Sequence, residues 1–257
     1  MVTLRKSILP AAALSLILLA GGCAKKVKVV YVPAPPPPSP SVPKATPAPD
    51  TRPPATASTV PDAGGNADTE FVATHSPIST EEGLASWYGP PYHNHRGANG
   101  QIFDQNAFTA AHRTLPMNSL IKVTNVGTGQ SVVVRVTDRG PFVEGRVLDL
   151  SVASAKAAGV WRPGIAKVRI DVYQTPLPIA EGGRWCVQVG AFKDGDEAVK
   201  LRDHLLRKYH TANVIEFTGP TGHWVRIRPQ NDDKGRAVEI ANELTPVEGN
   251  AYLVRLD

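Results

Sequence analysis

One carboxylate is placed by its sequence context to transfer protons. Asp138 precedes Arg139-Gly140-Pro141, which predicts a tight loop that holds the carboxylate at the mouth of a barrel. A buried carboxylic acid has a raised pKa, so it can exchange a proton near neutral pH. The alternative is an aspartate that only caps its own loop. His112 could orient the acid, or it could be a structural histidine with satisfied ring nitrogens.

Other patterns that would support catalysis or metal binding are weak. The segment His93-Asn94-His95 has the spacing of metal ligands, but no companion ligand cluster accompanies it, and a solvated loop is the better interpretation. The sequence contains no glycine-rich phosphate loop, HExxH motif or paired CxxC. Only two cysteines are present, which excludes a four-cysteine zinc site. We therefore expect neither a metal nor a cofactor.

The elements that must position Asp138 are short strands. Turn signals at Asn99-Gly100, 125–129 and Gly140-Pro141 separate them, and Ser151 is a plausible N-cap for a helix over 152–158. This density of strands within about ninety residues predicts a compact β-barrel domain over 83–175. The expected strands are 84–88, 120–124, 131–136, 147–150 and 166–172.

A second domain is predicted over 181–257 from the order strand, helix, strand, strand, helix, strand (βαββαβ). The expected elements are strand 185–190, helix 194–209, strands 213–217 and 224–228, helix 234–244 and strand 251–256. Helices on one face of such a sheet leave the other face exposed. Period-two alternation puts Trp224, Arg226 and Arg228 on one face, opposite Val225 and Ile227. These residues could bind a sugar ring that carries a carboxylate, or they could be ordinary solvated strand residues.

The N-terminal 22 residues have the features of an export signal. Arg5 and Lys6 precede an apolar run that is too short to cross a bilayer comfortably and that ends in small residues. The segment Leu19-Ala-Gly-Gly-Cys23 resembles a lipobox, which implies a bacterial lipoprotein acylated at Cys23. By the same resemblance, Ala24 favours the outer membrane over the inner. Lipidation would leave Cys186 as the one thiol, and its apolar strand context predicts a packed residue.

Residues 23–82 are expected to be a lipidated N-terminus and a disordered tether. Half of the 24 prolines lie between Pro33 and Pro61, and Pro35-Pro36-Pro37-Pro38 favours an extended polyproline conformation. At about 3.1 Å per residue, the 40 residues from Ala24 to Ala63 could reach roughly 120 Å. Such a spacer would carry a domain from a membrane surface into a surrounding polymer.

The net charge of +5 does not indicate nucleic-acid binding. The middle segment 83–175 holds the basic excess, with ten basic and five acidic residues and no run of lysine or arginine. We expect no nucleic-acid partner.

A series of short motifs runs through the middle domain in one order and spacing. They are Gly83-Leu-Ala-Ser-Trp-Tyr-Gly89, Ala98-Asn-Gly100, Phe103-Asp104, Thr109-Ala-Ala-His-Arg-Thr-Leu-Pro116, Val123-Thr-Asn125, Asp138-Arg-Gly-Pro-Phe142 and Asp149-Leu-Ser151. Through these motifs the domain resembles the rare lipoprotein A family over its whole length. The resemblance implies a double-psi β-barrel and a septal lytic transglycosylase that cleaves the MurNAc–GlcNAc bond of peptide-free peptidoglycan strands. It also implies proton transfer by Asp138, with His112 assisting.

One departure from the family concerns a second catalytic carboxylate. The family usually has glutamate directly after Ala-Asn-Gly, whereas this sequence has Gln101. An amide can hydrogen-bond a sugar hydroxyl but cannot exchange a proton at neutral pH. The alternative is therefore a non-catalytic, expansin-like protein that grips glycan without cutting it.

The last domain resembles a SPOR domain through Val187-Gln-Val-Gly-Ala-Phe192 and the order of its elements. The resemblance implies binding of peptide-free glycan at the division septum, with Gln188 matching the family's glutamine. Glycan contacts are thus expected at Gln101, Gln188, Trp224 and Arg226. The expected location is the periplasmic side of a membrane, with division-site proteins as candidate further partners.

Overall fold

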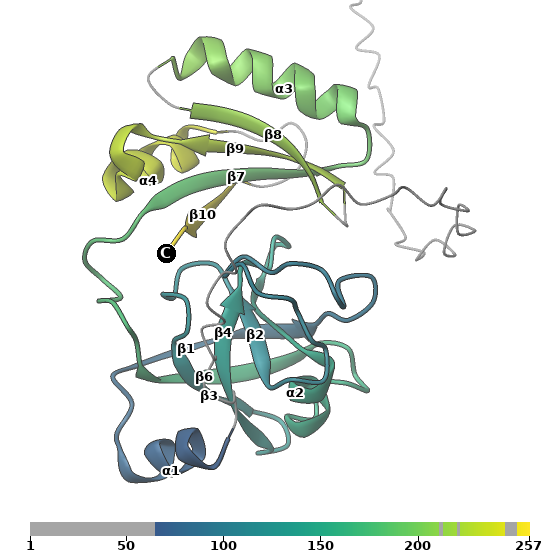
Figure 1. Ribbon diagram of the computed structural model, residues 1–257, viewed down its shortest axis with the longest axis vertical. Coiled ribbons are helices and arrows are strands. Elements are labelled where there is room, and N and C mark those ends of the chain that lie inside the picture. Colours follow the sequence, from purple (N-terminus) through teal and green to yellow (C-terminus); the bar gives the residue numbers. More distant parts are fainter. Residues whose placement is uncertain (1–64, 211–212, 220–221, 245–250) are drawn as a thin grey trace, which may run out of the picture. The chain divides into compact units, whose positions relative to one another are not determined.

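The computed structural model describes residues 65–210, 213–219, 222–244 and 251–257. The predicted signal segment, Cys23 and most of the predicted tether lie outside the described residues. Within them, no helix is long and apolar enough to cross a membrane. Figure 1 shows a barrel in blue to teal and a sheet with helices α3 (Gly195–Lys208) and α4 (Lys234–Glu243) in green to yellow.

Regular structure occurs within the range 23–82 that was predicted to be a disordered tether. Helix α1 (Asn66–Thr74) lies within that range, and strand β1 begins at Ser79. In α1, Asp68 is buried and accepts a hydrogen bond from Arg135 Nε at 2.9 Å, and Val72 is also buried. These contacts join α1 to a strand more than sixty residues away. Composition within the segment gives no sign of them.

Six strands close the barrel in the order β1-β5-β2-β4-β3-β6. Its interior is filled by aliphatic side chains that alternate along the strands, such as Val134 and Val136, or Leu148 and Leu150. The strands are β1 Ser79–Trp87, β2 Thr109–His112, β3 Leu120–Asn125, β4 Ser131–Asp138, β5 Arg146–Leu150 and β6 Ala166–Gln174.

Two of the barrel's strand pairs are parallel and both contain a shift of register. Strand β1 pairs with β5, with a shift between Leu84 and Ala85, and β2 pairs with β4, with a shift between Ala110 and Ala111. An extra residue on one strand turns the following side chains to the other face. Helix α2 (Val152–Ala157) follows β5, and the side chain of Ser151 caps it by accepting from Ser154 N at 3.1 Å.

The C-terminal domain is an antiparallel sheet in the order β10-β7-β9-β8. Asp194 and Asp233 cap α3 and α4 through their side chains, as expected for residues at helix N-termini. Both helices pack against the apolar face formed by residues such as Val187, Val225 and Ile227 (Figure 1). The elements are β7 Trp185–Phe192, α3 Gly195–Lys208, β8 Asn213–Gly219, β9 Gly222–Arg228, α4 Lys234–Glu243 and β10 Ala251–Arg255.

The predicted fold class, a β-barrel followed by a βαββαβ domain, is confirmed. Strand β2 was missed. Its sequence, Thr-Ala-Ala-His, is only four residues long and contains two alanines, so it carries little β-propensity of its own. Cys186 is fully buried, and burial raises the pKa of its thiol to about 11, as suits a packed residue.

Candidate active site

Asp138 ends strand β4 and is fixed by backbone groups on two sides. Its Oδ1 accepts hydrogen bonds from Arg139 N at 2.8 Å and from Ala98 N at 2.9 Å. Burial raises the pKa of the carboxyl, and these two bonds together with the Arg139 charge oppose that rise. Asp138 is therefore more than a cap for its own loop, because it also binds the segment around Ala98.

Two arginines hold the loop that follows Asp138. Arg139 Nη1 donates to the carbonyl oxygens of His112, the last residue of β2, at 3.0 Å and of Leu115 at 2.7 Å. Arg113 Nη1 donates to the carbonyl oxygens of Pro141 at 2.9 Å and Arg146 at 2.8 Å. The ends of β2, β4 and β5 are thus joined around one loop. This arrangement preorganises the carboxylate without using it as a structural ion pair.

Gln101 lies in the segment that binds Asp138. Its Oε1 accepts from Asn99 Nδ2 at 2.9 Å, and its backbone N–H donates to Asn99 Oδ1 at 3.0 Å. The structure therefore brings the predicted glycan contact near the predicted acid through the 96–102 segment. The side-chain oxygen of Gln101 is committed to Asn99.

His112 is not directed at Asp138. The residue is 3% exposed, and its Nδ1 accepts from the backbone N–H groups of Thr114 at 3.2 Å and Leu115 at 3.0 Å. Nε2 lies 3.2 Å from Glu81 Oε2, and this hydrogen bond lowers the pKa of Glu81. Because Nδ1 accepts from two backbone N–H groups, Nε2–H is the donor in the hydrogen bond to the Glu81 carboxylate. Both nitrogens are used, which favours the structural alternative for this histidine.

The predicted glycan face of the C-terminal sheet is more covered than expected. Gln188 pairs directly with Arg226, whose Nη2 donates to Gln188 Oε1 at 2.8 Å. Gln188 is 3% exposed and Trp224 6%, so the expectation that both are exposed is wrong. The Trp224 ring lies beside Gly190 and 5.1 Å from the ring of Phe142, and these neighbours exclude solvent from it.

His93 and His95 stand outside any cluster of ligands. His93 Nδ1 accepts from Gln105 N at 3.3 Å and lies 3.8 Å from Asp104 Oδ1. No group of three or more histidine, cysteine or acidic side chains suited to a metal occurs within the described ranges.

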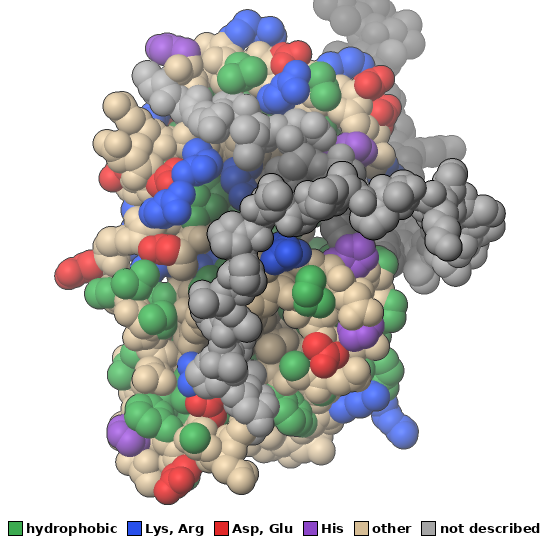
Figure 2. All heavy atoms as spheres, in the orientation of Figure 1, with side chains coloured by type: hydrophobic (Ala, Val, Ile, Leu, Met, Phe, Trp, Pro, Cys, Tyr) green, Lys and Arg blue, Asp and Glu red, His purple; other side chains and the backbone are tan. Residues whose placement is uncertain are grey.

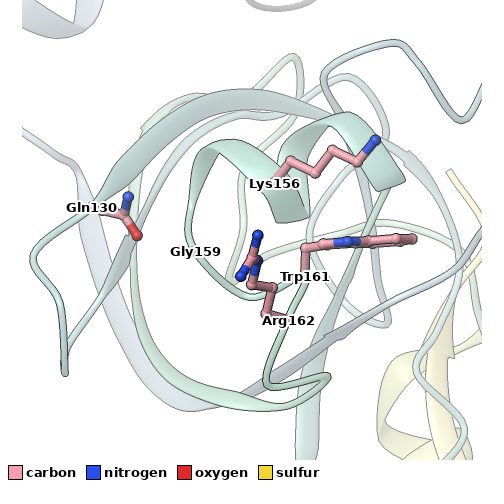
Figure 3. A pocket seen from close by; sticks show the side chains of 5 residues that line it. All are labelled: Gln130, Lys156, Gly159, Trp161 and Arg162. Carbon is pink, nitrogen blue, oxygen red and sulfur yellow. The ribbon is translucent and has the colours of Figure 1, made fainter.

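A cavity of about 510 Å³ lies at the other end of strand β4. Gln130 precedes this strand and Asp138 ends it, so roughly 25 Å of extended chain separates them. In Figure 3 the Lys156 side chain extends along Trp161, with its Nζ 5.2 Å from the ring centroid. The lining contains none of the predicted site residues; it consists of Gln130, Lys156, Gly159, Trp161 and Arg162. On the face drawn in Figure 2, basic and acidic side chains are interspersed.

Comparison with known families gives the two domains their relatives. Residues 80–170 match a double-psi β-barrel family described as lytic transglycolase, and residues 181–255 match the SPOR domain. Two solved structures, a Streptomyces papain inhibitor and a Clavibacter michiganensis expansin, align with TM-scores of 0.32 and 0.31 at 18% and 15% identity. They cover 38% and 69% of this chain, and 97% and 90% of their own chains.

Several curated relatives are named endolytic peptidoglycan transglycosylase RlpA. The protein of Vibrio cholerae is 40% identical over 161 residues, which are 60% of this chain and 61% of the relative. That of Campylobacter jejuni is 38% identical over 170 residues, which are 56% of this chain and 62% of the relative. A probable RlpA of Synechocystis is 58% identical over 92 residues, which are 36% of this chain and 29% of the relative. The chain thus spans less than two thirds of the length of each.

Proposed function

Because the chain joins a lytic transglycolase domain to a SPOR domain and is related to rare lipoprotein A, we propose that it is a peptidoglycan lytic transglycosylase. It cleaves MurNAc–GlcNAc bonds of peptide-free glycan strands and leaves 1,6-anhydro ends. The observation that carries the proposal is Asp138, a preorganised carboxylate whose pKa burial raises. Such a group can exchange a proton with a reacting sugar oxygen while the C1–O bond breaks and the new one forms.

A lytic transglycosylase needs no water as nucleophile. The C6 hydroxyl of the same sugar attacks C1, so the site must hold the strand, supply a proton and accept one. Asp138 would take part in this transfer, and Gln101 would hydrogen-bond a sugar hydroxyl. Gln188, Trp224 and Arg226 would hold glycan through the C-terminal domain, once the cover over Trp224 opens.

The experiment measures 1,6-anhydro-muramyl products from peptide-free glycan strands by mass spectrometry. Asp138→Asn should lower the rate by about 10² to 10⁴-fold, because the amide keeps the shape of the side chain but cannot exchange a proton. Asp104→Asn is the matched control. Asp104 is an exposed aspartate whose Oδ1 accepts from the nearby Asn106 N at 2.9 Å. The Asp104→Asn variant should therefore form anhydro product at the rate of the wild type.

A non-catalytic glycan-binding protein is the second candidate, and Gln101 is the observation that favours it. Gln101→Glu should raise the rate if a carboxylate at this position assists the reaction. If the wild type, Asp138→Asn and Gln101→Glu all bind glycan and none gives an anhydro product, the enzyme proposal fails. The binding protein is then the better account.

The proposed location follows from the same chemistry. A lipid on Cys23 would anchor the chain to the periplasmic side of the outer membrane, and the SPOR domain would concentrate it at septal glycan. Division-site proteins are proposed as further partners.

A further inference from the structure

A second carboxylate stands two strands away from Asp138. In the barrel, β2 lies between β4 and β5, and Ala111 of β2 is the register partner of both Asp138 and Asp149. Residues that pair directly across neighbouring strands project to the same face of a sheet. Asp138, Ala111 and Asp149 therefore form one row across three strands.

The shift of register in the β2–β4 pair creates this row. Ala110 pairs with Val136, and both are core residues, whereas the next residue, Ala111, pairs with Asp138 rather than Thr137. Without the extra residue, Asp138 would follow Val134 and Val136 into the barrel interior. The shift turns it to the outer face, where Asp149 also lies, because Leu148 and Leu150 point inward.

The two carboxylates project from the same face of the sheet and interact. Neighbouring strands lie about 4.8 Å apart, so the Cα atoms of Asp138 and Asp149 are roughly 10 Å apart. The charge of Asp138 raises the pKa of Asp149, so the two carboxyl groups act on each other. Carboxyl groups that flank a scissile glycosidic bond are about 5 to 9.5 Å apart, a separation that side chains on Cα atoms at this spacing can reach. The side chain between them, Ala111, is a single methyl group.

The two carboxylates have different surroundings. Asp138 Oδ1 accepts two backbone N–H groups, which favour the ionised form. Asp149 Oδ2 lies 3.3 Å from Arg146 Nη2, while its Oδ1 is buried and, among the described residues, lacks a hydrogen-bond partner. Its side chain is 16% exposed. A buried polar atom without a partner needs an explanation, and a catalytic role is one.

The charged and titratable groups around Asp149 come from four elements. Burial raises the pKa of Asp149 most, and the net value is about 6. Arg146 on β5 and Arg113 after β2 lower this pKa, and Asp138 on β4 raises it. Tyr88, after β1, has a pKa raised first by burial and then by Asp138 and Asp149. Burial raises the pKa of both carboxyls, but two backbone N–H groups bind Asp138 whereas no residue in the described part of the chain bonds to Asp149 Oδ1, and this difference in hydrogen bonding suits separate roles as base and acid.

We infer that Asp149 is the second carboxylate of the reaction and supplies the proton, so that Gln101 need not. The inference rests on the proposed function. Asp149 gives its proton to the bridging oxygen as the C1–O bond breaks and the electron pair stays on that oxygen. Asp138 accepts the proton of the C6 hydroxyl, whose oxygen bonds to C1. One bond breaks and one forms, no water is consumed, and proton exchange with solvent resets both carboxyls.

The test measures the full-length protein on two substrates that differ in their leaving group. Peptide-free glycan strands need a protonated leaving oxygen, whereas the 4-nitrophenyl glycoside of the GlcNAc–MurNAc disaccharide releases nitrophenolate without one. Asp149→Asn should lower kcat/KM on strands by about 10² to 10⁴-fold and on the nitrophenyl substrate by less than tenfold. Asp138→Asn should lower both, and Asp104→Asn neither.

A structural role for Asp149 gives a different result. If Asp149→Asn slows both substrates equally, or slows neither, the inference is overturned while the proposed function stands. If the wild type gives no anhydro product from strands, the proposed function fails first and the inference with it.

Should Asp149→Asn fail to fold, as judged by circular dichroism, the wild type still decides the matter. Its kcat/KM on strands should fall as the pH rises above about 6, while kcat/KM on the nitrophenyl substrate should not fall there. Equal pH profiles for the two substrates overturn the inference.

Discussion

At the scale of single residues, the proposed site stores a cost in stability. Asp149 is ionised at neutral pH beside a second buried carboxylate, although Arg146 and Arg113 offset part of this cost. A pKa raised from 3.8 to about 6 corresponds to about 3 kcal/mol against the ionised form in the folded state. Functional groups are commonly kept at such a cost.

This cost predicts a pH dependence of stability. Between about pH 4 and pH 6 the folded state binds more protons at Asp149 than the unfolded state, so the free energy of unfolding falls as the pH rises. The fall between pH 4.5 and pH 7 due to Asp149 should be about 2 kcal/mol. Urea unfolding at the two pH values should show that Asp149→Asn removes it.

Carboxyls with lowered pKa, such as Glu81 and Asp232, act in the opposite direction and mainly below pH 4.5. They are present in both proteins, so they cancel in the comparison. An equal change between pH 4.5 and pH 7 in the wild type and in Asp149→Asn would contradict the assigned pKa.

At the scale of elements, one glycine in β7 makes room for an aromatic ring on β9. Gly190 has φ +150° and is the register partner of Trp224. A Cβ atom at residue 190 would lie 2.7 Å from Trp224 Cε3 and 3.1 Å from the carbonyl oxygen of His223. A residue with a side chain would therefore clash with β9 and would also be strained at this φ, unless the two strands moved apart.

Gly190→Ala should therefore lower the melting temperature of the C-terminal domain. Clash and strain together should cost at least about 2 kcal/mol, or roughly 8 to 16 °C for a domain of this size, measured by calorimetry. Gly182→Ala is the control, since residue 182 also has positive φ but has no atom within 4 Å of the added Cβ. It should cost about 1 kcal/mol. Equal shifts would show that the ring contact is unimportant.

Sequence patterns located most elements because alternation and capping are local signals. The helix caps Ser151, Asp194 and Asp233 depend only on neighbouring residues. The row of Asp138, Ala111 and Asp149 was not predictable in this way, because it depends on strand order and on a register shift. Asp149 was visible in a motif, but its partnerless oxygen exists only in the folded barrel.

The same limit applies to the sheet of the C-terminal domain. Alternation correctly placed Val225 and Ile227 in its core, opposite Trp224. It could not show that Trp224 and Gln188 are buried, since side chains from outside the strand cover them. Local pattern gives the face of a residue, whereas burial also depends on distant parts of the chain.

At the scale of the whole molecule, the predicted anchor is the feature to test. Cys23→Ser should leave a precursor that is unprocessed or cut elsewhere, because serine offers no thiol for the lipid. Radiolabelled palmitate should enter the wild type and not the variant. Cys186→Ser is the matched control and should still be labelled, because that thiol is buried in β7. Label in Cys23→Ser would refute the lipobox interpretation.

Closure of the barrel also determines when this chain can fold. Strand β1 pairs with β5 on one side and with β6 on the other, so the first strand of the barrel to be synthesised pairs with the last two strands of the barrel. At roughly 5 to 20 residues per second, Ser79 is made about 5 to 20 s before Gln174. Both edges of β1 lack partners until β5 is made, and one edge still lacks its partner until β6 is complete. Contacts so distant in sequence slow folding, and the unpaired edges need protection from association until β6 arrives.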